Sequence, residues 1–370
     1  MPDIRRVLLI QPLEGARWRS INAYALSLEQ MLTSAGVEVD IASAPWFNPP
    51  SMVRGAARRW THQPELRAAT AGEYDVVHLT DHALAHHARR FEQHTAVVVT
   101  CHDLMPFTTP GYYETGREAR LKRAFLKRPI GRLSETHTVA VSEYTRRQMV
   151  EFLGVEEASI TVVPNSVRGV FAPRERAEAE HALGEFGIEL PASLRVLSVG
   201  NDRAYKNLPA LLGALARPAL AHASLIRVGA PIAGRARAEA ERLGLIRRIT
   251  DLGHISDETL ALVYSACDVL AQPSLAEGFG LPVIEAMASG LPVAASDGGA
   301  LPEVTAGAAV IVPLDAADFA GAFAAGLLQA VAGRDELSRL GSARAEAFKP
   351  AQVLPRLLDA YARAIESGKR

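Results

Sequence analysis

Short runs of valine, isoleucine and leucine alternate with longer helical patterns along most of this chain. This alternation constrains the fold more than any other feature, because strand–helix–strand units form parallel sheets covered by helices. A first series of strands is predicted at 7–10, 37–42, 76–79, 96–100 and 138–141. A second series is predicted at 195–199, 225–228, 248–252, 269–272, 292–295 and 309–312. The chain is therefore expected to form two α/β domains.

The rhythm breaks between Arg168 and Ala192, a stretch rich in charge, proline and alanine that resembles a connection. We expect an amino-terminal domain over 1–168 and a carboxyl-terminal domain over 169–350, with an amphipathic helix over 351–370 completing the first. A length of 370 residues suits two domains. Ligands of open parallel sheets bind beyond the carboxyl ends of the strands, so the expected site is a cleft between the two domains.

Composition narrows the class of protein. The formal net charge of -1 argues against a general nucleic-acid binder. Cys101 and Cys267 are the two cysteines, which indicates buried thiols in a reducing cytoplasm and no disulfide framework. Residues 117–132 carry seven Lys/Arg and one acid around a helical apolar stripe. Two interpretations of this segment stay open: peripheral contact with an anionic membrane, or a solvated helix that packs on its own domain.

The stretch EGFGLPVIEAMASG begins at Glu277 and places Glu285 eight positions further on. It follows a predicted strand, and its proline fits the first turn of a helix, with Glu285 expected in that same turn. The glycines leave backbone N–H groups open to an anion at a helix N-terminus. One elongated ligand would suit these pieces, with a phosphate at the loop and hydroxyls at both acids. The alternative is that both acids merely stabilise the helix N-terminus.

Together with its neighbours, this stretch resembles the two-glutamate signature of retaining nucleotide-sugar glycosyltransferases of family 4. Those enzymes have the GT-B fold, an α/β architecture of two Rossmann-like α/β/α domains that face each other across a cleft. Four further segments resemble parts of the family in the same order: HDLMP at 102–106, VSEYTRRQMVEFLGVEEASITVVPNSV at 141–167, SVGNDRAYKNLPALL at 198–212 and GHISDETLALVYSACDVLAQPS at 253–274. The resemblance runs from about 78 to 312.

Family membership implies a role for each matching residue. Glu285 would bind the ribose hydroxyls of the nucleotide, and Glu277 would face the transferred sugar. Lys206 would pair with the diphosphate, and His102 would lie near the sugar. The rest of the implied donor site is mostly main chain: Gly200, Asn201, Gly253, His254, Ile255, Phe279, Gly280 and Leu281.

The sequence departs from the family in two places. Many relatives have an arginine for the β-phosphate where this chain has Asn201, so Arg203 or Tyr205 is expected to contribute there instead. The loop after the first strand lacks the usual glycine pair and keeps only Gly15. The residues expected on the acceptor side are Gly15, Trp18, Arg19, Asn22, Asp81, His82 and Asp103.

The resemblance implies transfer of a hexose, mannose or glucose, from a GDP- or UDP-linked donor to an acceptor hydroxyl, with retention of configuration. The expected acceptor is a cell-surface glycan or glycolipid. No metal or other cofactor is expected, because Lys206 and backbone dipoles would do the work of a divalent ion. Two alternatives stay open: a GT-B-like sugar-nucleotide epimerase, and a weakly active nucleotide-sugar-binding protein. A nicotinamide dehydrogenase is excluded, since the first strand leads to QPLEGARW and not to a G-x-G-x-x-G turn.

Overall fold

The computed structural model describes residues 3–12, 19–44, 64–93, 95–109 and 130–368. These residues divide into two compact units, each with its own parallel sheet. Unit 1 contains the described residues before 108, those from 130 to 166 and those from 350 onward. Unit 2 contains residues 167–349 together with 108 and 109. The two α/β units confirm the predicted fold class.

The sheet of unit 1 has the strand order β2-β1-β3-β4-β5-β6. Its strands are β1 Arg6–Pro12, β2 Glu38–Ala44, β3 Val76–Leu79, β4 Ala96–Cys101, β5 His137–Ala140 and β6 Ile160–Val162. Its helices are α1 Arg19–Ser34, α3 Pro64–Thr70, η2 His82–Arg90, α4 Met105–Thr108, η3 Gly131–Glu135, α6 Glu143–Leu153, η4 Glu157–Ser159 and α15 Pro350–Gly368. The sequence did not predict β6, which has only three residues and little periodicity of its own.

Alternate residues of these strands belong to different apolar cores. Val7 and Leu9 lie in one core with the buried faces of α1 and α15, whereas Leu8 and Ile10 lie in the other with η2, α3 and α6. Successive side chains of a strand point to opposite faces, so a sheet covered on both sides needs apolar residues at every position. This explains why the runs in the sequence are continuous and do not alternate with polar residues.

The sheet of unit 2 has the order β12-β11-β10-β7-β8-β9, and the hydrogen-bonded neighbours in it are parallel. Its strands are β7 Leu194–Gly200, β8 Ala223–Gly229, β9 Ile249–Asp251, β10 Val269–Gln272, β11 Val293–Ser296 and β12 Val310–Val312. Its α-helices are α7 Arg176–Glu185, α8 Leu208–Leu215, α9 Gly234–Arg242, α10 Asp257–Ala266, α11 Leu281–Ala288, α12 Leu301–Thr305, α13 Phe319–Ala332 and α14 Arg334–Ala345. Short 3-10 turns are η5 Ala204–Lys206, η6 Pro218–Leu220, η7 Ile246–Arg248 and η8 Glu346–Phe348.

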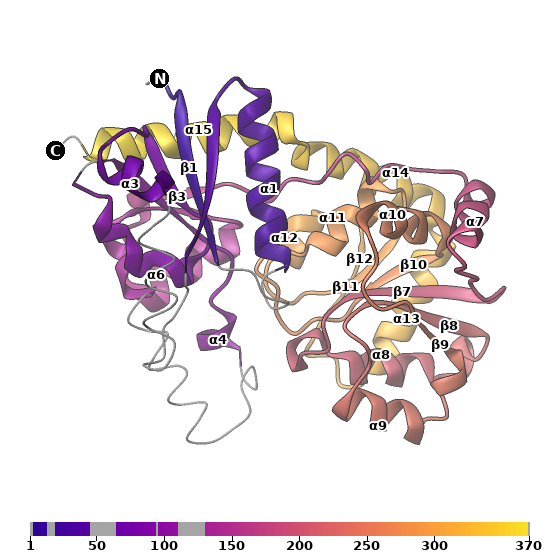
Figure 1. Ribbon diagram of the computed structural model, residues 1–370. Helices are drawn as coiled ribbons and strands as arrows, with labels where there is room; N and C mark the ends of the chain where they lie inside the picture. The colour runs from indigo at the N-terminus through magenta and orange to yellow at the C-terminus, as the bar shows by residue number, and fades with distance from the viewer. Residues whose placement is uncertain (1–2, 13–18, 45–63, 94, 110–129, 369–370) are drawn as a thin grey trace. The chain divides into compact units, whose positions relative to one another are not determined.

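Helices cover both faces of this second sheet as well. Figure 1 shows α10, α11 and α14 on one side of it and α8, α9 and α13 on the other. The strand order is that of a doubly wound nucleotide-binding fold, in which connections run outward in opposite directions from two central strands. Those two strands are β7 and β10, which are neighbours in space although two other strands separate them along the chain.

Candidate functional site

The strand order of unit 2 determines where its functional side chains meet. Ligands of doubly wound sheets bind beyond the carboxyl ends of the strands at the point where the order reverses. Here that point lies between β7, which ends at Gly200, and β10, which ends at Gln272. The loops that follow these two ends carry Lys206 and Glu277.

An ion pair joins Lys206 and Glu277. The Nζ of Lys206 lies 2.7 Å from Oε1 of Glu277, and the two side chains are only 13% and 9% exposed. The pKa of Lys206 is raised: burial by itself favours the neutral amine, but the adjacent Glu277 carboxylate outweighs that effect. The site therefore holds a charged ammonium in a region of restricted solvent access.

Glu277 takes its protein hydrogen bonds on one oxygen. Its Oε1 accepts from Lys206, from Nε2 of Gln272 at 2.6 Å and from Oγ of Ser274 at 2.6 Å. Among the described residues, these hydrogen bonds of the Glu277 side chain do not involve its Oε2. The carboxylate is thus fixed by one oxygen and keeps the other for a hydroxyl group of a ligand.

Two hydrogen bonds to backbone carbonyls hold the Lys206 loop against the Glu277 loop. The carbonyl of Tyr205 accepts from the N–H of Leu275 at 2.7 Å, and Nδ2 of Asn207 donates to the carbonyl of Pro273 at 3.2 Å. Gly200 leaves room for the lysine, because a Cβ there would lie 3.3 Å from Cε of Lys206 and the residue has a φ of +134°. A side chain at this position would crowd Cε of Lys206 and would be strained at that φ.

Glu285 lies on α11, and both of its oxygens have protein partners. Tyr264 donates its hydroxyl to Oε2 at 3.0 Å, and Arg168 donates to Oε1 at 3.2 Å. Burial raises the pKa of Glu285, although Arg168 and Tyr264 favour the ionised form. Each carboxylate oxygen has two lone pairs, so both can still accept a hydrogen bond from a diol.

One detail of the prediction about Glu285 is wrong. The helix begins at Leu281, with Gly280 as N-cap and Pro282 in its first turn, and that turn contains no acid. Glu285 is in the second turn, so it does not serve as a carboxylate at the helix N-terminus. This removes the interpretation that Glu285 merely stabilises the helix N-terminus.

The loop that joins β10 to α11 is shaped by glycines. A Cβ on Gly299 would lie 2.3 Å from the carbonyl of Glu277, and one on Gly298 would lie 2.3 Å from the carbonyl of Ser274. The loop after β11 therefore lies directly against the loop of Glu277. Phe279 packs its ring edge-on against Phe348 with 5.5 Å between the ring centroids. Its side chain is thus engaged within unit 2, and its main chain is the part left for a ligand.

The other expected donor residues lie at the same edge of the sheet. Gly253, with a φ of +64°, follows β9, and its carbonyl accepts from Gly229 at the end of β8 at 2.8 Å. His254 next to it is exposed and Ile255 is half-buried. The side chain of Asn201 braces its own loop, because Oδ1 accepts from the N–H of Arg203 and Nδ2 donates to the hydroxyl of Tyr205. Arg203 is exposed, and its contact with a phosphate stays a prediction.

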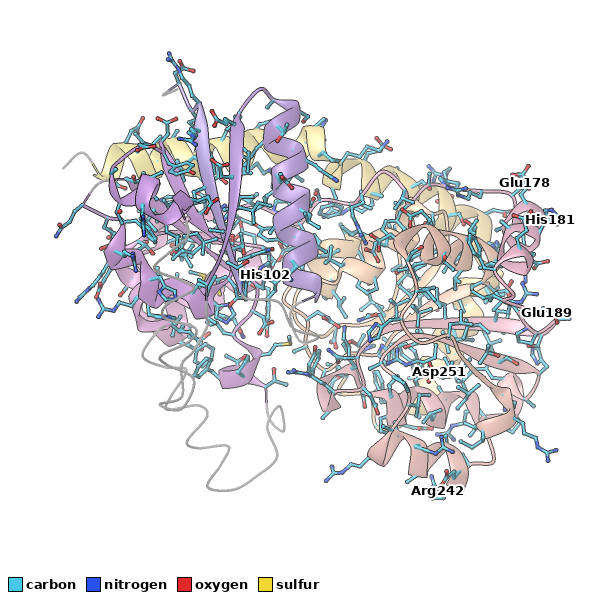
Figure 2. The ribbon with its side chains drawn as sticks, in the orientation of Figure 1. His102, Glu178, His181, Glu189, Arg242 and Asp251 are labelled. Atoms are coloured by element: carbon cyan, nitrogen blue, oxygen red, sulfur yellow. The ribbon has the colours of Figure 1, made fainter. Side chains whose placement is uncertain are left out.

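His102 lies in unit 1, at the carboxyl end of β4, and is labelled in Figure 2. Its Nε2 is 2.9 Å from the carbonyl of Thr80, so this nitrogen carries a proton. Burial lowers the pKa of His102, although Asp81 opposes that effect. Burial also raises the pKa of Asp81 to about 6. The neutral imidazole is thus oriented by a backbone bond, and its second ring nitrogen is an acceptor.

Two of the residues expected on the acceptor side, Asp81 and Asp103, have local structural roles. Asp81 caps η2 by accepting from the N–H of Ala83 at 2.7 Å, and Asp103 accepts from the N–H of Met105, the first residue of α4, at 3.0 Å. His82 has a buried Nδ1 with no hydrogen-bond partner among the described residues, 3.9 Å from the Asp81 carboxylate. These roles do not exclude contact with a substrate, which stays a prediction.

Several expectations fall on parts of the chain that the structure does not describe. Gly15, Trp18 and most of the basic segment 117–132 lie outside the described residues, as does the side chain of Arg19. Asn22 is described, and its buried Oδ1 has no hydrogen-bond partner in the described part of the chain. None of the described helices is long and apolar enough to cross a membrane.

Sequence reasoning missed the residues that hold the two acids in place. The ion partner Arg168 lies in a stretch that resembled a connection, and Tyr264 lies in a helix without a motif of its own. Gln272 and Ser274 flank Pro273 at the end of a buried strand, where two polar side chains could have been noticed. A further signal was Arg227, a charge inside the otherwise apolar run SLIRVG.

Comparison with known proteins shows the class of protein to which this chain belongs. Residues 191–344 match the family model described as glycosyl transferases group 1, and residues 21–168 match the one described as glycosyltransferase family 4. The chain also has the fold of solved GT-B proteins. It superposes on sucrose-phosphate synthase from Thermosynechococcus elongatus with a TM-score of 0.76 at 21% identity, covering 98% of this chain and 100% of that one. The protein is an enzyme with the GT-B fold, and specifically a glycosyltransferase.

This chain belongs to the glycosyl transferases of group 1. It is 27% identical over 271 residues to O-antigen chain mannosyltransferase B of Escherichia coli, covering 71% of this chain and 69% of that protein. It is 35% identical over 244 residues to D-inositol 3-phosphate glycosyltransferase of Nocardia farcinica, covering 61% of this chain and 52% of that protein. A structure of Anabaena HepE in complex with UDP-glucose matches with a TM-score of 0.70 at 17% identity, over 96% of this chain and 99% of that one.

Proposed function

We propose that this enzyme transfers a hexose from a nucleoside-diphosphate sugar to an acceptor hydroxyl with retention of anomeric configuration and without a metal ion. The observation that carries the proposal is the arrangement in unit 2, where one buried ammonium lies beside Glu277 and a second buried acid, Glu285, lies on the helix that follows. A donor of this kind has three parts, a diol on the ribose, a diphosphate and a sugar. Glu285 would bind the ribose diol, Lys206 would bind the diphosphate, and Glu277 would bind the sugar.

Breaking the bond between the sugar and the diphosphate leaves growing negative charge on the β-phosphate. An ammonium held in place before the reaction stabilises that charge without reorganisation, which typically contributes about 10²–10³ in rate per donor. Lys206 is placed for this role because Gly200 makes room for it and Glu277 keeps it protonated. Glu277 would orient the sugar with the oxygen that its protein partners do not use.

The leading donors are GDP-mannose and UDP-glucose. A relative of this chain is named as a mannosyltransferase of O-antigen chains, and a structural neighbour was solved with UDP-glucose. A cell-surface glycan or lipid-linked glycan is the proposed acceptor. Retention follows from the family resemblance. Cytoplasmic residence and contact of residues 117–132 with anionic lipid stay predictions.

A screen of UDP-, GDP-, ADP- and dTDP-sugars by thermal shift, in buffer with EDTA, tests the proposal. One donor should raise the melting temperature of the wild-type enzyme, and EDTA should not abolish the effect. Lys206→Met and Glu285→Gln should each weaken binding of that donor, measured by calorimetry. The proposal is wrong if no nucleotide sugar binds, if binding needs a divalent ion, or if both variants bind the donor as wild type does.

A further inference from the structure

A buried guanidinium lies within the sheet of unit 2. Arg227 is the fifth residue of β8 and is only 1% exposed. No carboxylate of the described residues forms an ion pair with it, and its Nε has no hydrogen-bond partner among them. Burial lowers the pKa of Arg227, while Asp202 and Asp251 favour its charged form from beyond ion-pair distance. Burying a charge without a counter-ion is strongly unfavourable, so such a residue needs an explanation.

The partners of Arg227 are backbone carbonyls at the carboxyl edge of the sheet. Its Nη2 donates to the carbonyl of Gly200 at 2.8 Å and to that of Asn201 at 3.0 Å, with a longer contact to Ala230 at 3.4 Å. Its Nη1 donates to the carbonyl of Ser198 at 3.2 Å. The guanidinium therefore gathers the carbonyls of one corner, where β7 and β8 end.

Because these carbonyls point toward Arg227, the N–H groups of the same peptides point away from it. The C=O and N–H of a trans peptide point in opposite directions, and the described chain has no cis peptide bond. The N–H groups of Asn201 and Asp202, which belong to the peptides of the Gly200 and Asn201 carbonyls, therefore point away from Arg227. Successive N–H groups that point to the same side can bind an anion together. Lys206 lies across the same corner, since its Cε is 3.3 Å from a Cβ built on Gly200.

We propose that Arg227 is a positioning residue for the donor diphosphate. It holds the corner of Gly200 and Asn201 in the conformation that presents N–H groups and Lys206 to the phosphates, and it adds a fixed positive charge beneath them. The bound diphosphate is then the counter-ion that Arg227 lacks in the free enzyme. This inference rests on the proposed function. It also explains how a chain with Asn201 in place of an arginine would keep positive charge at this position.

Binding of a nucleoside diphosphate compared with its nucleoside tests the proposal. The probe is whichever of UDP, GDP, ADP and dTDP binds wild type best, together with the nucleoside of the same base. Arg227→Met should weaken binding of the diphosphate by about 10- to 100-fold, the size typical of interactions with a charged group, and leave binding of the nucleoside unchanged. Arg227→Lys should restore part of the difference, because it restores the charge but not the fork of donors.

Arg248 provides a matched control at the opposite end of β8. It also donates to backbone carbonyls, those of Ala223 at 2.8 Å and Leu220 at 2.6 Å. Arg248→Met should lower the melting temperature without changing the ratio of the two affinities. The proposal is overturned if Arg227→Met weakens both ligands equally, if it weakens neither, or if Arg248→Met changes the ratio as much. Failure of the proposed function would appear differently, as a wild-type enzyme that binds no nucleoside diphosphate.

Discussion

The ion pair between Lys206 and Glu277 offers the sharpest test of the site, because it requires no knowledge of the substrate. The perturbations are Lys206→Met, Glu277→Gln and the double variant, all in the free enzyme. Both side chains are largely buried and their charged atoms lie 2.7 Å apart. Removing one partner of a buried pair typically costs about 3–5 kcal/mol, mainly because the other charge is left uncompensated.

The magnitude for Lys206→Met should fall near the lower limit of that range. Gln272 and Ser274 would still donate to the Glu277 carboxylate and offset part of the loss. A loss of about 3 kcal/mol corresponds to roughly 6–12 °C in a unit of this size. The double variant leaves no unpaired charge, so it should lose less than the sum of the single variants by about 2 kcal/mol.

Differential scanning calorimetry can follow the unfolding of unit 2 in all four proteins. If the losses of the two single variants sum to that of the double variant within about 0.5 kcal/mol, the pair is not coupled in solution and the reasoning is refuted.

The same variants should also differ in how they bind ligands. Lys206→Met should weaken binding of a nucleoside diphosphate more than Glu277→Gln does, because it removes the ammonium itself. Glu277→Gln should mainly lower sugar transfer. Equal effects of both on the nucleoside diphosphate would contradict the separate roles.

Two further predictions concern buried polar groups. Tyr264→Phe removes the hydroxyl that donates to Glu285 at 3.0 Å, so calorimetry should show a loss of about 1.5–3 kcal/mol in unit 2 and weaker binding of a nucleoside diphosphate. Unchanged nucleotide affinity would separate Tyr264 from the ribose site. Burial lowers the pKa of His78 to about 3, so the native state stays neutral while the unfolded state gains a proton below about pH 6.5. The contribution of His78 to the free energy of unfolding is therefore fully present above pH 6.5 and decreases as the pH falls. At pH 5 it has decreased by about 2 kcal/mol. In urea unfolding, the free energy of unfolding of His78→Gln should fall less between pH 7 and pH 5 than that of wild type, by about 2 kcal/mol. An equal fall in both proteins would contradict the lowered pKa of His78.

The sequence alone was enough to predict the architecture, and it named the residues of the candidate site. Continuous apolar runs separated by helical patterns predicted two doubly covered parallel sheets, since only strands buried on both faces need apolar residues at successive positions. Glu277, Glu285 and Lys206 follow strands in loops or early helical turns, and local rules place such residues at the carboxyl edge. These inferences depend on neighbours along the chain, which a sequence displays directly.

Strand order and side-chain partners required the tertiary structure. Lys206 meets Glu277 across 71 positions because β7 and β10 pair, and no local pattern fixes which strands become neighbours. The same holds for Arg168 and Tyr264, which reach Glu285 from distant segments, and for Arg227, whose acceptors are carbonyls that any residue type could supply. A hydrogen bond or ion pair depends on distances of a few ångströms, and those distances are determined only when the packing of helices on sheets brings separate segments together.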